Sequence, residues 1–257
     1  MATFAEITAH LDQLLRPDAF PDNANAFNGV QVETAAEIRR IATAVDARER
    51  TIEGAHDAGA NLLIVHHGLF WRGVHPLRGP VFRRVRALIQ HEIGVYSSHI
   101  PLDAHAEFGN NVLLARALGL TPNADFANFD GVDIGVAGDA DVPTEQIVRA
   151  ATEFSARFAT TARHTPCASG RRTRRWGICS GAGADVRTLR EATVRGIDTM
   201  IVGEGPHWSA IDAEEAGIVL IYAGHYATET LGVRALGDHL TARFDIPSTF
   251  IDAPTGL

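Results

Sequence analysis

The 257-residue sequence contains no lysine, so all 23 of its lysine-plus-arginine positions are arginine. This absence excludes a Schiff-base lysine, an anchor for pyridoxal phosphate, a Ser–Lys nucleophile pair and the lysine of a Walker-type phosphate loop. Histidine, by contrast, occurs twelve times. Imidazoles and carboxylates are therefore the first candidates for reactive groups.

Cysteine is also scarce: only Cys167 and Cys179 are present, so the fold needs no disulfide framework. No run of about 18 apolar residues occurs, and we therefore expect no transmembrane helix and no membrane partner. The first residues lack both the basic region and the apolar segment of a secretory signal peptide. Together these features predict a protein of the reducing cytoplasm.

The formal net charge of −8 argues against nucleic acid as a partner, because phosphate binding needs a clustered basic face. One local exception is the run Arg171–Arg175, which reads Arg-Arg-Thr-Arg-Arg. We interpret it as a solvated loop beside a strand. The alternative is a rim that steers anionic ligands.

The most informative stretch is residues 62–71, Leu-Leu-Ile-Val-His-His-Gly-Leu-Phe-Trp. Its four aliphatic residues predict a fully buried strand, and two histidines stand where that strand ends, before Gly68. Neighbouring side chains inside a strand point to opposite faces, but at a strand end that turns through glycine two imidazoles can share a target. His66 and His67 are therefore either metal ligands or ordinary loop histidines.

Helices and buried strands alternate along the whole chain. The expected strands are 28–33, 41–45, 62–65, 94–98, 132–136, 176–179, 199–202, 218–222 and 248–251. The expected helices are 4–16, 47–59, 82–91, 110–118, 143–158, 185–195, 207–216 and 228–243. This alternation predicts an α/β fold with mixed, largely parallel sheets. A loop-like stretch at 121–131 marks the boundary between an N-terminal unit, 1–127, and a C-terminal unit, 128–257.

The two halves of the sequence echo each other. Residues 55–68 have the pattern Ala-x-x-x-Gly-x-Asn-x-x-Ile-Val-x-x-Gly, and residues 192–205 repeat it with Asp in place of Asn. In both halves a strand then ends in Tyr-x-x-His, at His99 and at His225. Any two α/β units can share such features, but the identical spacing favours a partial internal duplication.

Polar residues collect where the expected strands end. They are His66 and His67, His99 with Asp103, Glu204, and His225 with Glu229. Ligands of α/β sheets gather at the carboxyl ends of strands, and the spacing of four puts His225 and Glu229 on one face of a helix. Each residue also has an ordinary interpretation. His99 could bond a backbone carbonyl, Asp103 and Glu204 could cap helices, and His225 could be a satisfied buried histidine.

The candidate donors are nitrogen and oxygen, without cysteine. This set excludes a structural zinc site of the finger type and suits Zn, Fe, Mn, Co or Ni. Five ligands, His66, His67, Asp103, His225 and Glu229, are too many for one tetrahedral ion and too few to saturate two. An unsaturated two-metal site with a bridging carboxylate, from Glu229 or Asp103, would activate water near neutral pH.

These motifs resemble the Nif-three-like family, whose members are often named GTP cyclohydrolase I type 2 homologues. The resemblance is carried by the stretches 28–32, 66–71, 99–111, 180–185, 203–204 and 224–229, in family order, and it runs from about residue 4 to the C-terminus. It implies two intertwined, partly duplicated α/β/α units. It also implies a toroidal homohexamer and two divalent transition-metal ions.

The same resemblance implies that His66, His67, Asp103, His225 and Glu229 hold the metals, and it carries over Glu204 and His99 as pocket residues. Two features depart from many relatives. The link between the halves is short, so no inserted domain is expected, and Tyr226 stands where a second histidine is common.

The function expected from these observations is a dinuclear metal-dependent hydrolase. Metal-activated water would attack a nucleotide or related small molecule, with Glu204 or His99 as catalytic groups that shuttle the proton. Two alternatives use the same residues. One is a hexameric metal-binding scaffold or metal-handling protein without turnover, and the other is a phosphoesterase.

Overall fold

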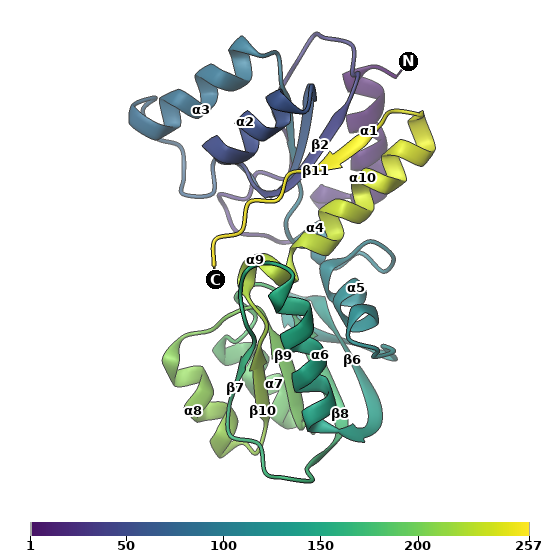
Figure 1. Cartoon of the computed structure of the whole chain (residues 1–257), viewed down its shortest axis with the longest axis vertical. Helices are drawn as coiled ribbons and strands as arrows, with labels where there is room; N and C mark the ends of the chain where they lie inside the picture. The colour runs from purple at the N-terminus through teal and green to yellow at the C-terminus, as the bar shows by residue number, and fades with distance from the viewer. Residues whose placement is uncertain (1, 257) are drawn as a thin grey trace. The chain divides into compact units, whose positions relative to one another are not determined.

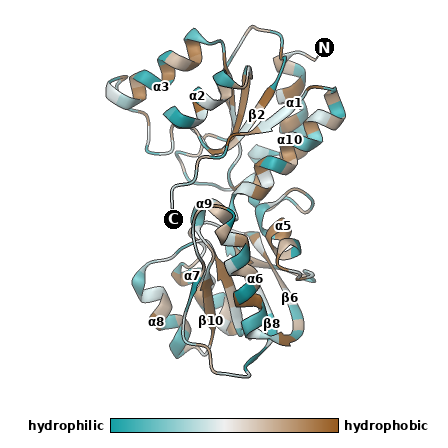
Figure 2. Cartoon of the chain, viewed as in Figure 1, coloured by the Kyte–Doolittle hydropathy of each residue, from teal (hydrophilic) through white to brown (hydrophobic). Residues whose placement is uncertain are grey.

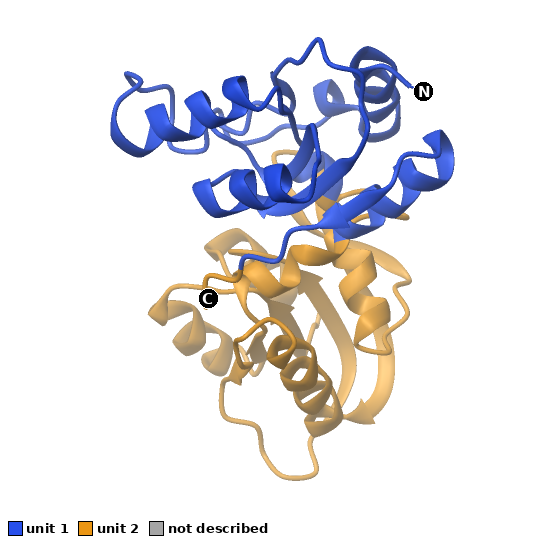
Figure 3. Cartoon of the chain, turned by 45° about the horizontal axis from the view of Figure 1, so that its top comes forward, with its two compact units in different colours: residues 1–102, 232–253 blue, residues 103–231, 254–257 orange. Residues whose placement is uncertain are grey.

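The computed structural model describes residues 2–256 and contains two mixed sheets flanked by helices, which confirms the α/β fold (Figure 1). The chain divides into two compact units (Figure 3). The first unit comprises the residues up to Leu102 together with Gly232–Ala253, and the second comprises Asp103–Leu231 and the residues from Pro254. The units therefore do not coincide with the expected 1–127 and 128–257, because residues 103–127 belong to the second unit and Gly232–Ala253 return to the first.

The first unit is built on a five-stranded sheet of order β1-β4-β3-β2-β11. Strands β4, β3, β2 and β11 run parallel, and β1 is antiparallel to β4. The strands are β1 (Gly29–Val32), β2 (Ile41–Asp46), β3 (Leu62–His67), β4 (Gly94–Ser97) and β11 (Ser248–Phe250). The helices that connect or precede them are α1 (Phe4–Leu15), η1 (Pro17–Ala19), α2 (Glu49–Asp57), α3 (Gly79–Gln90), α4 (Ile100–Asp103) and α10 (Thr230–Phe244).

The second unit is built on a six-stranded sheet of order β5-β6-β8-β9-β10-β7. Its centre, β8-β9-β10, is parallel, whereas β5, β6 and β7 pair antiparallel. The strands are β5 (Ala124–Phe129), β6 (Val132–Pro143), β7 (Arg163–His164), β8 (Arg172–Cys179), β9 (Thr199–Val202) and β10 (Val219–Tyr222). The helices are α5 (Asn110–Ala117), α6 (Thr144–Ala156), α7 (Val186–Val194), α8 (His207–Glu215) and α9 (His225–Thr228).

Two stretches expected to be loops are strands. Most of the segment 121–131, the predicted domain boundary, is strand β5, which pairs with β6. Pro, Asn, Asp and Gly give this segment the composition of a loop, although Phe126 and Ala127 are buried. Likewise, Arg172–Arg175 opens strand β8 rather than lying in a loop. Thr173, between two arginines, and Trp176, directly after them, are fully buried.

Each unit has its own apolar core. In the first, Ile52, Leu63 and Val65 pack in one buried cluster, and in the second Met200 and Leu220 do so. Figure 2 shows the corresponding contrast between mainly hydrophobic strands such as β2 and β10 and helices of mixed character. Among residues 2–256, no helix is long and apolar enough to span a membrane.

The internal echo corresponds to the same local structure in both units. The backbone N–H of Asn61 donates to the carbonyl of Arg40 (3.1 Å), and that of Asp198 donates to the carbonyl of Arg175 (2.9 Å). The side chains also match, because the oxygens of Asn61 and Asp198 accept from backbone N–H groups of Arg39 and Arg174, respectively. Each residue thus ties the start of one parallel strand to the strand before it, which supports the predicted duplication.

This role predicts that Asn61→Ala destabilises the first unit. Asn61 is buried, and its amide donates to the carbonyl of Glu37 (2.7 Å) while its oxygen accepts from the Arg39 N–H (3.0 Å). Leaving both backbone groups unsatisfied should cost about 1–3 kcal/mol of unfolding free energy, measured by urea titration. Gln90→Ala, at an exposed helix position, is the control. Equal small effects of both variants would contradict the assigned role.

Candidate metal centre

Three imidazoles gather in the first unit at the carboxyl ends of β3 and β4. His66 and His67 are the last residues of β3, so the strand is two residues longer than predicted, and His99 follows β4. The ring centroid of His66 lies 4.8 Å from that of His67 and 4.9 Å from that of His99. One potential ligand nitrogen from each ring lies within 4.8 Å of the others, so these three residues can hold a metal ion.

Each of these imidazoles is anchored through Nδ1. His66 Nδ1 donates to the carbonyl oxygen of Ser98 (2.9 Å), and His67 Nδ1 contacts the carboxylate of Asp46 (3.0 Å). A carbonyl or carboxylate oxygen can only accept, so the proton of the neutral ring stands on Nδ1 and the lone pair on Nε2. Partners of this kind orient metal-binding histidines in proteins.

His99 is held in the same way by Asp22, at 2.7 Å from Nδ1 to Oδ1. The interpretation of His99 as a residue bonded to a backbone carbonyl is therefore wrong. Burial raises the pKa of Asp22, but the hydrogen bonds from His99 and Asn28 outweigh burial and bring the pKa below its ordinary value. Asp22 is thus an anionic acceptor, and the Trp71 ring packs edge-on against His99 at 4.5 Å between centroids.

Gly68 gives the turn after these histidines its shape. A Cβ on Gly68 would collide with the side-chain amide of Gln31. That amide accepts from the Leu69 N–H (2.7 Å) and donates to the carbonyls of Ala26 and Phe27 (both 3.0 Å). Glycine at this position therefore lets Gln31 fix the backbone immediately after His67.

Asp103, the last residue of α4 and the first of the second unit, is not a helix N-cap. Its Oδ1 accepts from the amide of Asn110 (2.8 Å) and the hydroxyl of Ser180 (3.2 Å). Asp103 is buried, and Asn110 is fully so. The carboxylate is therefore held in one orientation by two neutral donors.

The expected pairing of His225 and Glu229 is confirmed. Nε2 of His225 lies 3.2 Å from a Glu229 oxygen, and Nδ1 lies 2.8 Å from Oε1 of Glu204. Glu229 is only 2% exposed, whereas the Glu204 side chain is 45% exposed. Helix α8 is capped by Pro206 without a side-chain bond, so Glu204 positions His225 instead of capping that helix.

A small-residue loop makes room for this pair. Gly181 adopts φ +58°, and a Cβ there would collide with the Glu229 carboxylate. The Gly181 N–H donates to the hydroxyl of Thr228 (3.1 Å), and the preceding Ser180 bonds Asp103. The loop 180–181 therefore links the two candidate carboxylate ligands of this unit.

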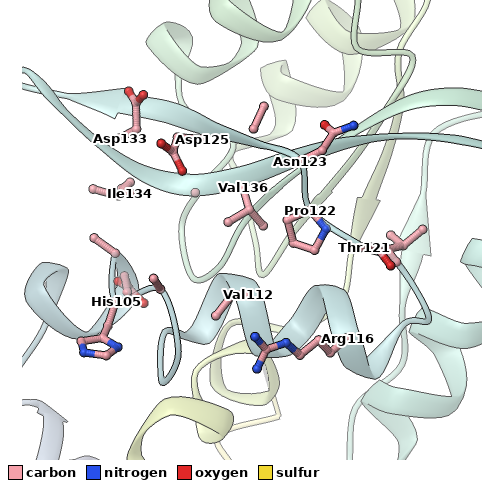
Figure 4. Close-up of a pocket in the computed structure, with 16 residues that line it drawn as sticks. His105, Val112, Arg116, Thr121, Pro122, Asn123, Asp125, Asp133, Ile134 and Val136 are labelled. Atoms are coloured by element: carbon pink, nitrogen blue, oxygen red, sulfur yellow. The ribbon is translucent and has the colours of Figure 1, made fainter.

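Asp103 also borders a cavity of about 600 Å³ between α5 and strands β5 and β6 (Figure 4). Its other polar lining includes His105, Arg116, Asp125 and Asp133. None of these four belongs to the predicted ligand set. The cavity thus reaches the candidate site only through Asp103.

Cys179, the only buried thiol among residues 2–256, is not a candidate metal ligand. Burial, together with the nearby carboxylate of Asp103, raises the pKa of Cys179 far above its ordinary value. A neutral thiol is neither a nucleophile nor a metal ligand. The site chemistry therefore remains with imidazole and carboxylate, as the sequence predicts.

The sequence did not identify the residues that anchor the candidate ligands. These are Asp22, Asp46, Asn110 and Ser180, which make the bonds described above, and Gly181, which leaves room for the Glu229 carboxylate. For one of them a signal existed, since Asp46 follows the last aliphatic residue of a buried strand as the histidines do. Asn110 is the first residue of helix α5, and the others lie outside helices and strands, where polar residues are common.

The environment of His225 predicts a pH-dependent stability. Burial lowers the pKa of His225, but the carboxylates of Glu229 and Glu204 outweigh burial and raise it to about 10. Because the folded pKa lies above the ordinary value of about 6.5, the stabilisation is complete below pH 6.5 and is lost as the pH rises to 10. The absence of lysine removes one class of group whose ordinary pKa lies near the top of this window.

After chelator treatment, we expect the wild-type protein to melt at a higher temperature than His225→Asn. This difference in melting temperature should be largest at pH 6.5 and should shrink towards pH 10. Differential scanning calorimetry across this range measures it. His91→Asn, at an exposed position, should show no such trend. A pH-independent difference for His225→Asn would contradict the assigned pair.

Comparison with known proteins agrees with this architecture. Residues 2–255 match the family Duf34/NIF3 (NGG1p interacting factor 3). The chain is 41% identical over 255 residues to a GTP cyclohydrolase 1 type 2 homolog of Deinococcus radiodurans, covering 98% of this chain and 94% of that protein. It is 38% identical to a protein of the same name from Pyrococcus abyssi, covering 98% of each. The solved structure of protein ybgI, of unknown function, superposes with a TM-score of 0.89 at 32% identity and covers all of both chains. The chain belongs to the DUF34/NIF3 family.

Proposed function

We propose that this protein is a dinuclear metal-dependent hydrolase acting on a nucleotide or a related small molecule. His66, His67, Asp103, His225 and Glu229 would hold two divalent ions, of Zn, Fe, Mn, Co or Ni. Bound ions would supply a water of lowered pKa as the nucleophile. The observation that carries the proposal is the anchoring of His66 and His67 through Nδ1, which leaves Nε2 as the donor nitrogen of both rings.

The donor set fits first-row transition metals. Neutral imidazoles and carboxylates suit these ions, and cysteine, which would indicate a structural zinc site, is missing from the set. The carboxylates of Glu229 and Asp103 are buried and held, so little ordering remains to be done when a cation binds. The anchoring bonds of both units match the second-shell partners that metal ligands require.

Two residues would move protons. Glu204 accepts from His225 Nδ1 and is nearly half exposed, so its carboxylate can also take a proton from a substrate. His99 carries its proton on Nδ1 against Asp22, which leaves Nε2 as a base. His99 also groups with His66 and His67, so it can serve as a further ligand instead.

The substrate class rests on similarity. Relatives up to 41% identical carry the name GTP cyclohydrolase 1 type 2 homolog, which supports a nucleotide. The alternatives predicted from sequence, a phosphoesterase and a metal-binding protein without turnover, use the same residues. We further propose a homohexamer, as the family resemblance implies, which light scattering measures directly.

The hydrolase proposal predicts that protein reconstituted with each candidate metal consumes GTP, and that His66→Ala lowers turnover by about 100-fold or more. Product mass spectrometry separates the chemistries, because ring opening adds water while phosphoesterase action releases phosphate. His91→Ala is the matched control, since this imidazole is exposed and stacks on His56, at 3.7 Å between centroids. Two bound ions without turnover on any nucleotide would favour the metal-binding alternative.

The loop 180–181 generates a second prediction. Gly181→Ala should displace the Glu229 carboxylate and weaken metal affinity by about tenfold, measured by competition with a chromophoric chelator. Gly196→Ala is matched, because Gly196 also has a left-handed φ, +67°, but its Cβ would meet nothing within 4 Å. Both variants share the cost of the strained backbone, about 1 kcal/mol. Equal metal affinity of the two would contradict the role of Gly181.

A further inference from the structure

Two cavities of the second unit meet beside Glu204. The first, of about 550 Å³, has a largely apolar lining that includes Pro166, Pro206, Ala210 and Ile211. The second, of about 530 Å³, is lined by the hydroxyl residues Thr160 and Thr161 and by backbone at Gly203 and Gly224. Three residues line both: Arg163, Glu204 and Tyr222. Together they form an apolar compartment and a polar compartment with a shared border.

The shared border lies where the chemistry is expected. Strand β7 pairs antiparallel with β10, and Arg163 stands opposite Tyr222, the last residue of β10. His225 follows three residues later and bonds Glu204, which borders both cavities. The compartments thus open at the carboxyl end of the parallel strands, where α/β sheets bind their ligands.

Arg163 is placed to bind an anion. Its side chain is exposed, and within residues 2–256 its guanidinium forms no hydrogen bond or ion pair with the protein. An arginine binds phosphate or carboxylate through two parallel N–H bonds. The hydroxyl of Thr161 adds a donor to the same polar compartment, whereas that of Thr160 donates to the carbonyl of Gly256 (3.3 Å).

The basic run Arg171–Arg175 does not provide this function. Arg172 and Arg174 both pair with Asp141, and Arg171 donates to the carbonyls of Asp198 (3.0 Å) and Gly217 (2.6 Å). The run also opens β8, whose other end is Cys179, seven residues and about 23 Å further along the strand. These arginines therefore stabilise the start of β8, at the end of the strand away from His225.

The apolar compartment has features of a ring site. Ile211 is 47% exposed although it is a large aliphatic residue, and it lines the cavity together with Pro206 and Tyr222. The carboxylate of Glu214 lines this compartment and not the polar one, so it would repel an anion here and accept from ring N–H groups. Its size falls within the range of small-molecule sites.

We propose that these two compartments bind the substrate as a planar heterocycle with N–H donors joined to an anionic group, as in a nucleotide. The ring lies in the apolar compartment against Ile211, and the anion lies in the polar compartment on Arg163. Glu204, between them, faces the ring. This inference rests on the proposed hydrolase function for the reaction itself, but the binding step needs no metal.

The test is isothermal titration of the full chain after chelator treatment, so that metal-bound phosphate cannot contribute. GMP is the probe for ring and anion together, and guanosine is the probe for the ring alone. Arg163→Ala should weaken GMP binding at least about tenfold and leave guanosine binding unchanged. Ile211→Asn should weaken both probes. Arg172→Ala combined with Arg174→Ala is the control and should change neither.

Equal GMP affinity of Arg163→Ala and wild type would overturn the anion assignment, as would an equal loss in the Arg172/Arg174 double variant. Absence of binding for both probes would overturn the pocket as a nucleotide site. Neither result bears on metal content or on turnover with another substrate, so failure of this inference is distinguishable from failure of the hydrolase proposal.

Discussion

The structure of the candidate site depends on one recurrent interaction, a hydrogen bond from Nδ1 of an imidazole to a fixed oxygen acceptor. Ser98, Asp46, Asp22 and Glu204 provide this oxygen for four histidines in turn. For the three anchored imidazoles of the first unit the bond sets both the tautomer and the ring orientation, because these acceptors cannot donate. Without it the histidines would be polar rings with no defined donor atom.

The fold supplies this interaction through repetition. In each unit, parallel strands end side by side, and an Asn or Asp side chain ties the start of one strand to the strand before it. Such ties fix the strand register, so the residues after each strand arrive at one edge of the sheet. Glycines complete the arrangement where backbone and ligand approach closely, as at Gly68 and Gly181. The ordinary physics of an α/β sheet therefore accounts for where the polar groups collect.

Much of this was predictable from the sequence, because burial and strand ends leave strong patterns. The strand before His66, the helical spacing of His225 and Glu229, and the duplicated motif all follow from hydrophobic periodicity and glycine positions. The return of α10 and β11 to the first unit was not predictable, since long-range strand pairing leaves no local pattern. The role of Arg172 and Arg174 was also missed, because their partner, Asp141, lies on the neighbouring strand.

The transition-metal content of protein purified without chelator or added metal is the most direct measurement of the central claim. Elemental mass spectrometry gives this content per chain. The account predicts about two first-row ions per chain, held by anchored imidazoles and buried carboxylates. A metal content at trace level that does not rise when Zn, Fe or Mn is added would contradict it.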